Sequence, residues 1–347
     1  MEIFDTIGRL GFGELVFGHD KATGLRAIAA IHSTRLGPAI GGCRLRGYAN
    51  EFEAIEDVTR LGQAMTYKAA LARLPHGGGK AVILAPSTLA DRANLFAAFG
   101  RFVDRLGGRY ITTEDSGTST TDMDAIRIAT RHVLGTSPDR GGAGDPSPFT
   151  AIGVRRGIEA IAHALFGKSD LRGLHVAVQG VGHVGTYLAR ELHQAGARLT
   201  ITDVLASQRA QIAKELGAEA VAPDEILHMD CDIVAPCALG GAITEELVSR
   251  LRCRAIAGAA NNQLATPAVG RALKARNIFY APDYAINAGG LIHVAEEYAG
   301  YKKERTLEKT SRIYDTISQI IERSQKDDLP PEVVANRMAE EIISGSG

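Results

Sequence analysis

The sequence predicts an α/β protein of two domains that ends in a helical segment. The chain has 347 residues, a length that suggests about two domains. Residues 136–148 are dense in Gly, Pro, Ser and Asp, which marks a loop or hinge. Beyond this loop, short apolar strands alternate with helices, as in a doubly wound parallel sheet. We therefore expect domains at residues 1–135 and 136–325, with a C-terminal helix at 326–347 that packs back toward the first domain.

The first region reads as one α/β unit. Asn50 can cap a helix that has Glu53 at its third position, and an apolar stripe follows at helical spacing. A second helix is expected at residues 93–106. Strands are expected at residues 24–32, 81–85 and 109–113.

The second region has the strand–helix rhythm of a Rossmann-like sheet. Helices are expected at residues 186–195 and 206–216, and isoleucines at helical spacing predict further helices near the C-terminus. Strands are expected at residues 175–179, 198–202, 232–235, 255–259 and 278–281.

The composition excludes several classes of function. The formal net charge of −1 provides no general attraction for nucleic acid or for a membrane surface. No apolar segment reaches the roughly 18 residues of a membrane span, and the N-terminus does not resemble a secretory signal. The four cysteines have no zinc-ligand spacing, so we expect no metal and a reducing, cytoplasmic location.

A glycine motif predicts a dinucleotide site. Gly180, Gly182 and Gly185 lie between a predicted strand and a predicted helix, where such glycines permit a tight turn beside a pyrophosphate. Asp203 ends the next strand, where its carboxylate can bind the adenosine ribose and repel a 2′-phosphate, so NAD is favoured. The alternative is that the glycines only form a turn and that Asp203 only caps a helix. The candidate cofactor-binding residues here are Gly180, Val181, Gly182, His183, Val184, Gly185, Thr186 and Asp203.

Two lysines are prominent because they are rare in this part of the chain. Between Lys21 and Lys168 the only lysines are Lys68 and Lys80, among many arginines. A buried lysine can lose its proton and act as a base, whereas arginine stays charged. Three glycines precede Lys80, so backbone and substrate can come close, and the strand at residues 81–85 would hold Lys80 at its start.

Asp115 follows the strand predicted at residues 109–113, at the carboxyl edge of the sheet. Plainer interpretations exist for these three residues. Lys68 could be an exposed helix lysine, Lys80 a surface turn lysine, and Asp115 the cap of a helix that starts near Thr120.

These motifs together resemble a known family. Segments that match in the right order cover nearly the whole chain: residues 36–44, 65–83, 109–124, 179–185, 235–241, 257–264 and 281–292. They resemble the glutamate/leucine/phenylalanine/valine dehydrogenase superfamily, and within it the leucine dehydrogenase branch. The resemblance implies a first domain for substrate and oligomerisation, a second for NAD, and a homo-oligomer.

The resemblance also implies a chemistry. The α-carboxylate of an L-amino acid binds Lys68, and hydride passes from Cα to the nicotinamide, leaving an imine. Lys80, held neutral by burial and nearby cationic charge, activates water to attack the imine, and Asp115 relays protons. Ammonia and a 2-oxo acid leave.

Further residues receive roles through the same resemblance. Those near the substrate are Gly41, Gly42 and Asn287; those near the nicotinamide are Thr150 and Asn262; those on the adenosine side are Cys237 and Ala238.

The residues matching the family's side-chain pocket are aliphatic or small: Ile40, Thr113, Leu291 and Val294. No cation is among them, so a γ-carboxylate would be buried unpaired, which disfavours glutamate. Leucine, valine and isoleucine fit, although Thr113 and Leu291 stand where the branch usually has alanine and valine. A methylene group changes discrimination by only about 1–3 kcal/mol, so overlapping substrates are expected.

Three alternatives remain at this point. Phenylalanine or tryptophan dehydrogenases share the same motifs. A 2-hydroxy-acid dehydrogenase would need a His–carboxylate couple and an arginine, which His132 and Arg131 do not provide convincingly. A catalytically silent NAD-sensing protein would have no use for Lys80 and Asp115.

Overall fold

A computed structural model describes residues 3–86, 91–168 and 170–345. The chain forms two compact units. The first groups the residues up to Asp145 with His293–Lys302 and the residues from Ala339, and the second comprises Pro146–Ile292 and Lys303–Met338. The first unit thus includes residues 136–145, beyond the predicted limit at 135. One reason lies in Glu297, whose carboxylate accepts hydrogen bonds from the backbone N–H groups of Gly135 and Ala143, at 2.9 and 2.8 Å.

The first unit is built on a five-stranded mixed sheet with the order β1-β2-β4-β3-β5. β2 pairs antiparallel with β1 and with β4, whereas β3 pairs parallel with β4 and β5. The strands are β1 (Glu14–Asp20), β2 (Leu25–Ser33), β3 (Ala39–Arg46), β4 (Gly77–Leu84) and β5 (Tyr110–Glu114).

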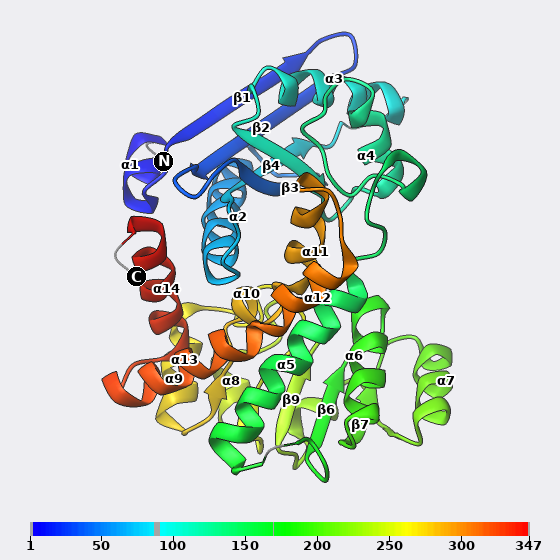
Figure 1. The fold of residues 1–347 in the computed structure, drawn as a ribbon, viewed down its shortest axis with the longest axis vertical. Helices are drawn as coiled ribbons and strands as arrows, with labels where there is room; N and C mark the ends of the chain where they lie inside the picture. The colour runs from blue at the N-terminus through cyan, green and yellow to red at the C-terminus, as the bar shows by residue number, and fades with distance from the viewer. Residues whose placement is uncertain (1–2, 87–90, 169, 346–347) are drawn as a thin grey trace. The chain divides into compact units, whose positions relative to one another are not determined.

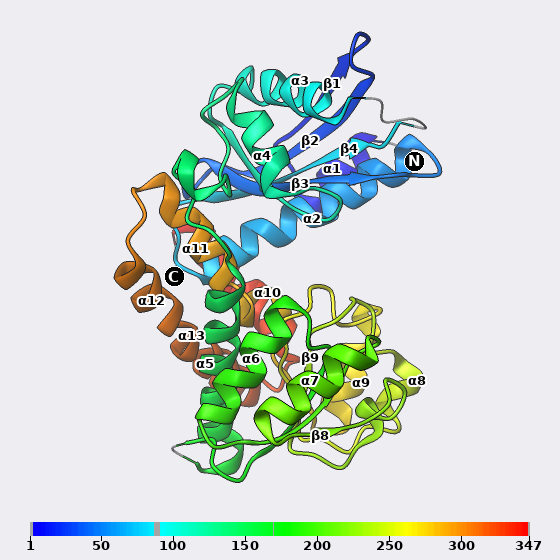
Figure 2. The same ribbon diagram turned by 90° about the vertical axis from the view of Figure 1, so that its right-hand side faces the viewer.

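Helices cover both faces of this sheet, with α2 on one face and α3 and α4 on the other (Figure 2). Asn50 caps α2 as expected, because its side chain accepts a hydrogen bond from the backbone N–H of Glu53. Apolar side chains of α2, including Val58, pack against Ile28 and Val82 of the sheet. The helices that begin in this part of the chain are α1 (Ile3–Leu10), α2 (Glu51–Leu71), α3 (Arg92–Asp104) and α4 (Thr120–Arg127).

Two expectations for this sheet need correction. β1 and β3 were not anticipated, because Gly18, Gly41 and Gly42 interrupt their apolar patterns. β4 begins at Gly77 and not at residue 81, so the three glycines lie inside the strand. They are needed for packing, since a Cβ on Gly78 would lie 2.0 Å from the backbone N of Thr66 in α2.

The second unit contains a six-stranded parallel sheet with the order β11-β10-β9-β6-β7-β8. When the strands are numbered along the chain from β6 and the sheet is read from β8 to β11, this is the 3-2-1-4-5-6 order of a doubly wound dinucleotide-binding sheet. The predicted fold class is confirmed. The strands are β6 (His175–Gln179), β7 (Arg198–Thr202), β8 (Glu219–Ala220), β9 (Ile233–Pro236), β10 (Ala255–Ile256) and β11 (Phe279–Tyr280).

Helices pack around this second sheet and against one another, and α5 lies beside both α6 and α13 (Figure 1). α8 and α9 contribute Val248, Val269 and Leu273 to a core with Val234 and Ile256 of the strands. The remaining helices are α5 (Ser147–Phe166), α6 (His183–Gln194), α7 (Ala206–Leu216), α8 (Glu245–Val248), α9 (Pro267–Ala275), α10 (Asp283–Ile286), α11 (Gly289–Tyr298), α12 (Lys303–Ser311), α13 (Ile313–Asp327) and α14 (Pro331–Ser344).

None of the helices in the described ranges combines the length and the hydropathy of a membrane span.

Candidate active site

A buried ion pair joins two of the predicted site residues in the first unit. Lys80 Nζ lies 3.0 Å from Asp115 Oδ1. Lys80 is 5% exposed, which rules out a surface turn lysine. Asp115 is not a helix cap, because Ser119 caps α4 in a capping box with Asp122. The structure therefore brings together two groups able to exchange a proton, at hydrogen-bond distance.

The strand register explains why these two side chains meet. Lys80 lies on the central strand β4, on the face covered by α2, because its neighbours Ala81 and Ile83 belong to the core on the opposite face. Gly42 of β3 pairs with Thr113 of β5, two residues before Asp115. A Cβ on Gly42 would lie 2.7 Å from the Cβ of Asp115. The missing side chain thus lets Asp115 fold back over the sheet.

Asp115 is bound on both of its carboxylate oxygens. Oδ2 accepts a hydrogen bond from Nε of Arg44, on β3, at 2.9 Å, while Oδ1 faces Lys80. Burial of Asp115 opposes ionisation, but Lys80 and Arg44 outweigh it and hold the pKa of Asp115 below its usual value. The site therefore contains an ionised carboxylate at neutral pH, held between two basic side chains.

The other predicted substrate residues lie on known elements. Lys68 is half-buried in the last turn of α2, so it is not a fully exposed helix lysine. Ile40 and Thr113 are buried on β3 and β5. Leu291 and Val294 are buried on α11, of which Leu291 belongs to the second unit and Val294 to the first.

The glycine loop of the second unit connects β6 to α6. Gly180 has a φ of +95°, and a Cβ on Gly185 would lie 1.9 Å from the carbonyl oxygen of Gly180, so these two glycines allow the turn and its close packing. A Cβ on Gly182 would meet nothing within 4 Å. That face of the loop is open, at the N-terminus of α6, where backbone N–H groups attract phosphate. The loop fits a dinucleotide pyrophosphate.

Asp203 holds the loop from the end of β7. Its Oδ2 accepts a hydrogen bond from the backbone N–H of Val181, and its Oδ1 one from that of Leu205, both at 2.9 Å. The helix cap of α7 is Leu205 and not Asp203. Thr186 also supports the loop by donating to the carbonyl of Val181 at 2.6 Å. His183 and Val184 form the start of α6.

Asn261 and Asn262 lie in the loop after β10, and Asn287 contacts this loop. Asn287 donates from Nδ2 to the carbonyl of Ala259, at 3.0 Å, and to Oδ1 of Asn261, at 2.8 Å. Asn262 has a left-handed backbone, with a φ of +52°. Cys237 and Ala238 follow β9, and Ala238 contacts the position where Gly180 would carry a Cβ. Thr150 lies in the first turn of α5, beside Gly290.

Sequence reasoning missed two residues of these sites. Arg44 is the last residue of the segment 36–44 that matches the family, but an arginine in an arginine-rich region carries no signal of its own. Asn261 adjoins the predicted Asn262, yet only the fold shows which of the two asparagines reaches Asn287. In the described part of the chain, no group of His, Cys, Asp and Glu side chains could hold a metal ion.

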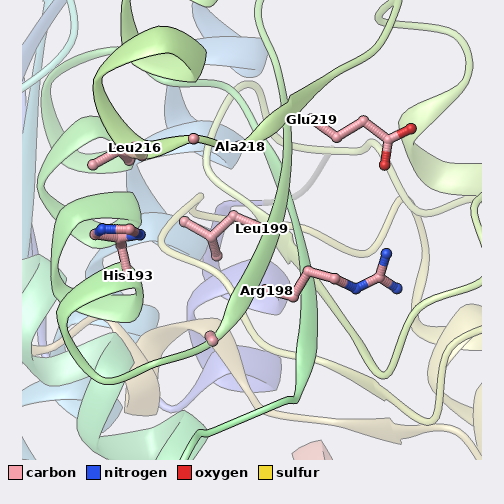
Figure 3. Close-up of a pocket in the computed structure, with 8 residues that line it drawn as sticks. His193, Arg198, Leu199, Leu216, Ala218 and Glu219 are labelled. Carbon is pink, nitrogen blue, oxygen red and sulfur yellow. The ribbon is translucent and has the colours of Figure 1, made fainter.

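A hollow of about 370 Å³ lies away from these residues, where α6 and α7 lead into β7 and β8. Five of the residues that line it are His193, Leu199, Leu216, Arg198 and Glu219. The side chains of Arg198 and Glu219 point away from those of the other three (Figure 3). Arg198 begins β7, so the hollow lies at the end of the strands opposite the glycine loop. It contributes nothing to the candidate active site.

The charged side chains beside this hollow give a pH-dependent stability. Arg198 donates to Nδ1 of His175 at 2.5 Å, and His175 Nε2 bonds Thr200, which donates to Glu219. Burial and then Arg198 lower the pKa of His175, and they outweigh the opposing effect of the backbone bond at Asp230 and of the Asp232 and Glu219 charges. Nδ1 must be unprotonated to accept from Arg198, so the folded protein favours the neutral ring.

The unfolded chain therefore binds this proton more readily, with an ordinary histidine pKa of about 6.5. Stability should fall as the pH drops below that value and level off once the pH is below the folded-state pKa. Urea unfolding at pH 7.5 and pH 5.5 measures the loss. We expect a smaller loss in His175→Gln than in the wild type and in the control His193→Gln, which changes an exposed residue. An equal loss in all three proteins would contradict the assignment.

Family models and proteins of known function match this chain over most of its length. The family model described as Glu/Leu/Phe/Val dehydrogenase, dimerisation domain, matches residues 15–132. The model Glutamate/Leucine/Phenylalanine/Valine dehydrogenase matches residues 141–206 and 200–341. The chain is 50% identical to a leucine dehydrogenase of Thermoactinomyces intermedius, over 99% of this chain and 94% of that protein. It is 47% identical to a valine dehydrogenase of Streptomyces virginiae, over 96% and 94%.

Solved structures also match nearly the whole chain. The L-tryptophan dehydrogenase of Nostoc punctiforme superposes with a TM-score of 0.89 at 40% identity, over 99% of both chains. A hetero-hexameric glutamate dehydrogenase of Thermus thermophilus gives a TM-score of 0.77 at 21% identity, over 99% of this chain and 96% of that one. The second likeness concerns the fold alone.

Proposed function

Because the chain belongs to the Glu/Leu/Phe/Val dehydrogenase family, and is thereby an amino-acid dehydrogenase, we propose that it deaminates branched-chain aliphatic L-amino acids with NAD. Leucine is the foremost substrate, and valine and isoleucine also react. The reversible reaction yields the 2-oxo acid, ammonia and NADH. The observation that carries the proposal is the buried Lys80–Asp115 pair, with its Nζ–Oδ1 distance of 3.0 Å.

The proposed roles are those that the family resemblance implies, and the ion pair between Lys80 and Asp115 supports them. Lys68 binds the substrate α-carboxylate through its ammonium group. Asp115, ionised at neutral pH, accepts a proton from the substrate amino group and returns one to the departing ammonia. Lys80 can pass its proton to Asp115 along their hydrogen bond, and in its neutral form it then serves as the general base that activates water for attack on the imine carbon. The proton that Lys80 takes from water can pass to Asp115 over one hydrogen bond.

The cofactor is proposed to be NAD, which when bound accepts the hydride from Cα. Gly180–Gly185 and the N-terminus of α6 would hold its pyrophosphate. Asp203 closes β7 with a carboxylate that already accepts from Val181 and Leu205. A 2′-phosphate beside this carboxylate would meet like-charge repulsion, which favours NAD over NADP. Thr150 and Asn262 are assigned to the nicotinamide end, Asn287 to the substrate, and Cys237 and Ala238 to the adenosine end.

The substrate class rests on Ile40, Thr113, Leu291 and Val294, which are all buried and uncharged. A γ-carboxylate among them would lose its hydration without gaining a cation, at a cost of at least several kcal/mol. Gly41 and Gly42 are assigned to the same site, where they leave room for the backbone of the amino acid.

We also propose a homo-oligomer in the cytoplasm. The matching family model for residues 15–132 is described as a dimerisation domain, which supports an assembly through the first unit. All four cysteines are free thiols, which suits a reducing compartment.

A steady-state panel tests the proposed function. The purified enzyme is assayed with leucine, valine, isoleucine, phenylalanine, tryptophan and glutamate, each with NAD and with NADP. We expect leucine, valine and isoleucine to lie within about 200-fold of one another in kcat/KM, since one methylene group changes discrimination by about that much at most. Glutamate should be at least about 10³-fold poorer, because its buried carboxylate is unpaired.

The outcomes separate the alternatives. A preference for phenylalanine or tryptophan would replace the aliphatic assignment by an aromatic one. Faster turnover with NADP than with NAD would overturn the role of Asp203. Binding of NAD without turnover of any amino acid would favour a silent sensor.

A further inference from the structure

We propose that Arg44 is a positioning residue that fixes Asp115 against Lys80 by anchoring it to a second buried carboxylate, Asp57. The inference rests on the proposed function of the Lys80–Asp115 pair and adds the device that orients it. Arg44 lies on β3 and Asp57 on α2, so the anchor joins the sheet to the helix that carries Lys68.

The two oxygens of Asp115 are bound by different cations. Oδ1 faces Lys80 Nζ at 3.0 Å and Oδ2 faces Arg44 Nε at 2.9 Å. A carboxylate held on one oxygen can rotate about its Cβ–Cγ bond, whereas one held on both oxygens cannot rotate without breaking a bond. Arg44 thus fixes the orientation of the carboxylate that Lys80 meets.

Arg44 is itself held from the opposite side. Its Nη1 donates to Oδ2 of Asp57 at 2.8 Å, and Tyr48 donates to the same oxygen at 2.8 Å. Arg60 approaches the other oxygen of Asp57 at 3.4 Å. Asp57 is only 8% exposed, and a buried carboxylate is costly unless it is paired. Because loss of these contacts would leave a buried charge unpaired, Asp57 keeps its bonds to Arg44 and Tyr48, and Arg44 is held in one orientation.

Only arginine suits this position. Its guanidinium offers Nε and Nη1 in one rigid plane, so it can donate to two carboxylates on different elements at once. A lysine would supply the charge but a single nitrogen. Charge and geometry can therefore be tested separately.

The experiment compares Arg44→Met, Arg44→Lys and the control Arg26→Met. Arg26 also links the sheet to α2, through Glu51, but on the exposed surface. In Arg44→Met we expect kcat for leucine deamination to fall by about 10²-fold, the loss that a misplacement of about 1 Å can cause. The KM for NAD should stay within about twofold, because the glycine loop belongs to the other unit.

The pH dependence distinguishes positioning from a merely structural ion pair. Removing a cation favours proton binding by the groups beside it, so the acidic limb of the kcat profile should move upward by about one pH unit or more in Arg44→Met. Arg44→Lys keeps the charge, so its limb should stay in place while its kcat falls by about tenfold through lost geometry. Arg26→Met should match the wild type in both.

One further measurement and two replacement variants keep the inference open to refutation. Infrared titration of the carboxylate band, assigned by its loss in Asp115→Asn, should show Asp115 protonating at higher pH in Arg44→Met, whether or not the enzyme turns over. If Arg44→Met does not fold, Arg44→Lys and Arg44→Met/Asp57→Asn replace it, the latter with no orphaned charge at position 57. Wild-type kcat and an unshifted limb in a folded Arg44→Met protein would overturn the inference. Full activity in Asp115→Asn would instead overturn the proposed function.

Discussion

Replacing Lys80 with alanine is expected to abolish leucine-dependent NADH formation, with kcat reduced by about 10³-fold or more. General acid–base catalysis by one placed group supplies about 10²–10⁴-fold, and here the substitution also removes the cation that faces Asp115 Oδ1. NAD binding should be retained, because the glycine loop lies in the second unit. Steady-state kinetics with leucine and titration calorimetry with NAD measure the two properties.

Two controls make this result specific. Lys80→Arg keeps a positive charge beside Asp115, yet arginine cannot release its proton near neutral pH, so a similar loss of turnover is expected. Lys326→Ala, at an exposed position of α13, should behave as the wild type. Retention of more than a tenth of the wild-type kcat in Lys80→Ala would falsify the proposed role of Lys80.

Replacing Gly78 with alanine is expected to destabilise the first unit by about 3 kcal/mol or more, the upper range for inserting a methyl group into packed structure. The added Cβ would lie 2.0 Å from the backbone N of Thr66 and 2.4 Å from its Cα. Backbone atoms cannot turn aside as a side chain can, so α2 must move away from β4. Lys68 is two residues beyond Thr66, so the substrate site should be disturbed as well.

Thermal unfolding and leucine kinetics measure both effects. A loss of about 3 kcal/mol corresponds to a fall in Tm of about 6 °C or more for a unit of this size, and the KM for leucine should rise. Gly47→Ala is the matched control, because a Cβ on Gly47, just after β3, meets nothing within 4 Å. Equal melting temperatures for the two variants would contradict the packing role of Gly78.

The sequence alone determined the features that are encoded locally. The glycine motif lies between a strand and a helix, and Asp203 ends the next strand. This pattern identified the doubly wound sheet of the second unit, because a tight turn that can bind a phosphate is specified by adjacent residues. The strands at His175–Gln179 and Arg198–Thr202 have the predicted bounds. Lys80 and Asp115 stood out by residue type and position, and the structure shows the contact between them.

The tertiary structure decided what depends on residues far apart in the chain. Arg44 meets Asp115 across 71 positions, a pairing set by the register of β3 and β5 that no local pattern records. Strands β1 and β3 were not predicted, because their glycines interrupt the apolar alternation. A side chain at these glycines would clash with residues of neighbouring elements. The three glycines before Lys80 suggested that a substrate could come close to the backbone. At Gly78, however, the absence of a side chain is required for the close packing of α2 against β4. Local sequence specifies periodicity, turns and caps, whereas cross-strand register and helix–sheet packing arise only when the whole unit has formed.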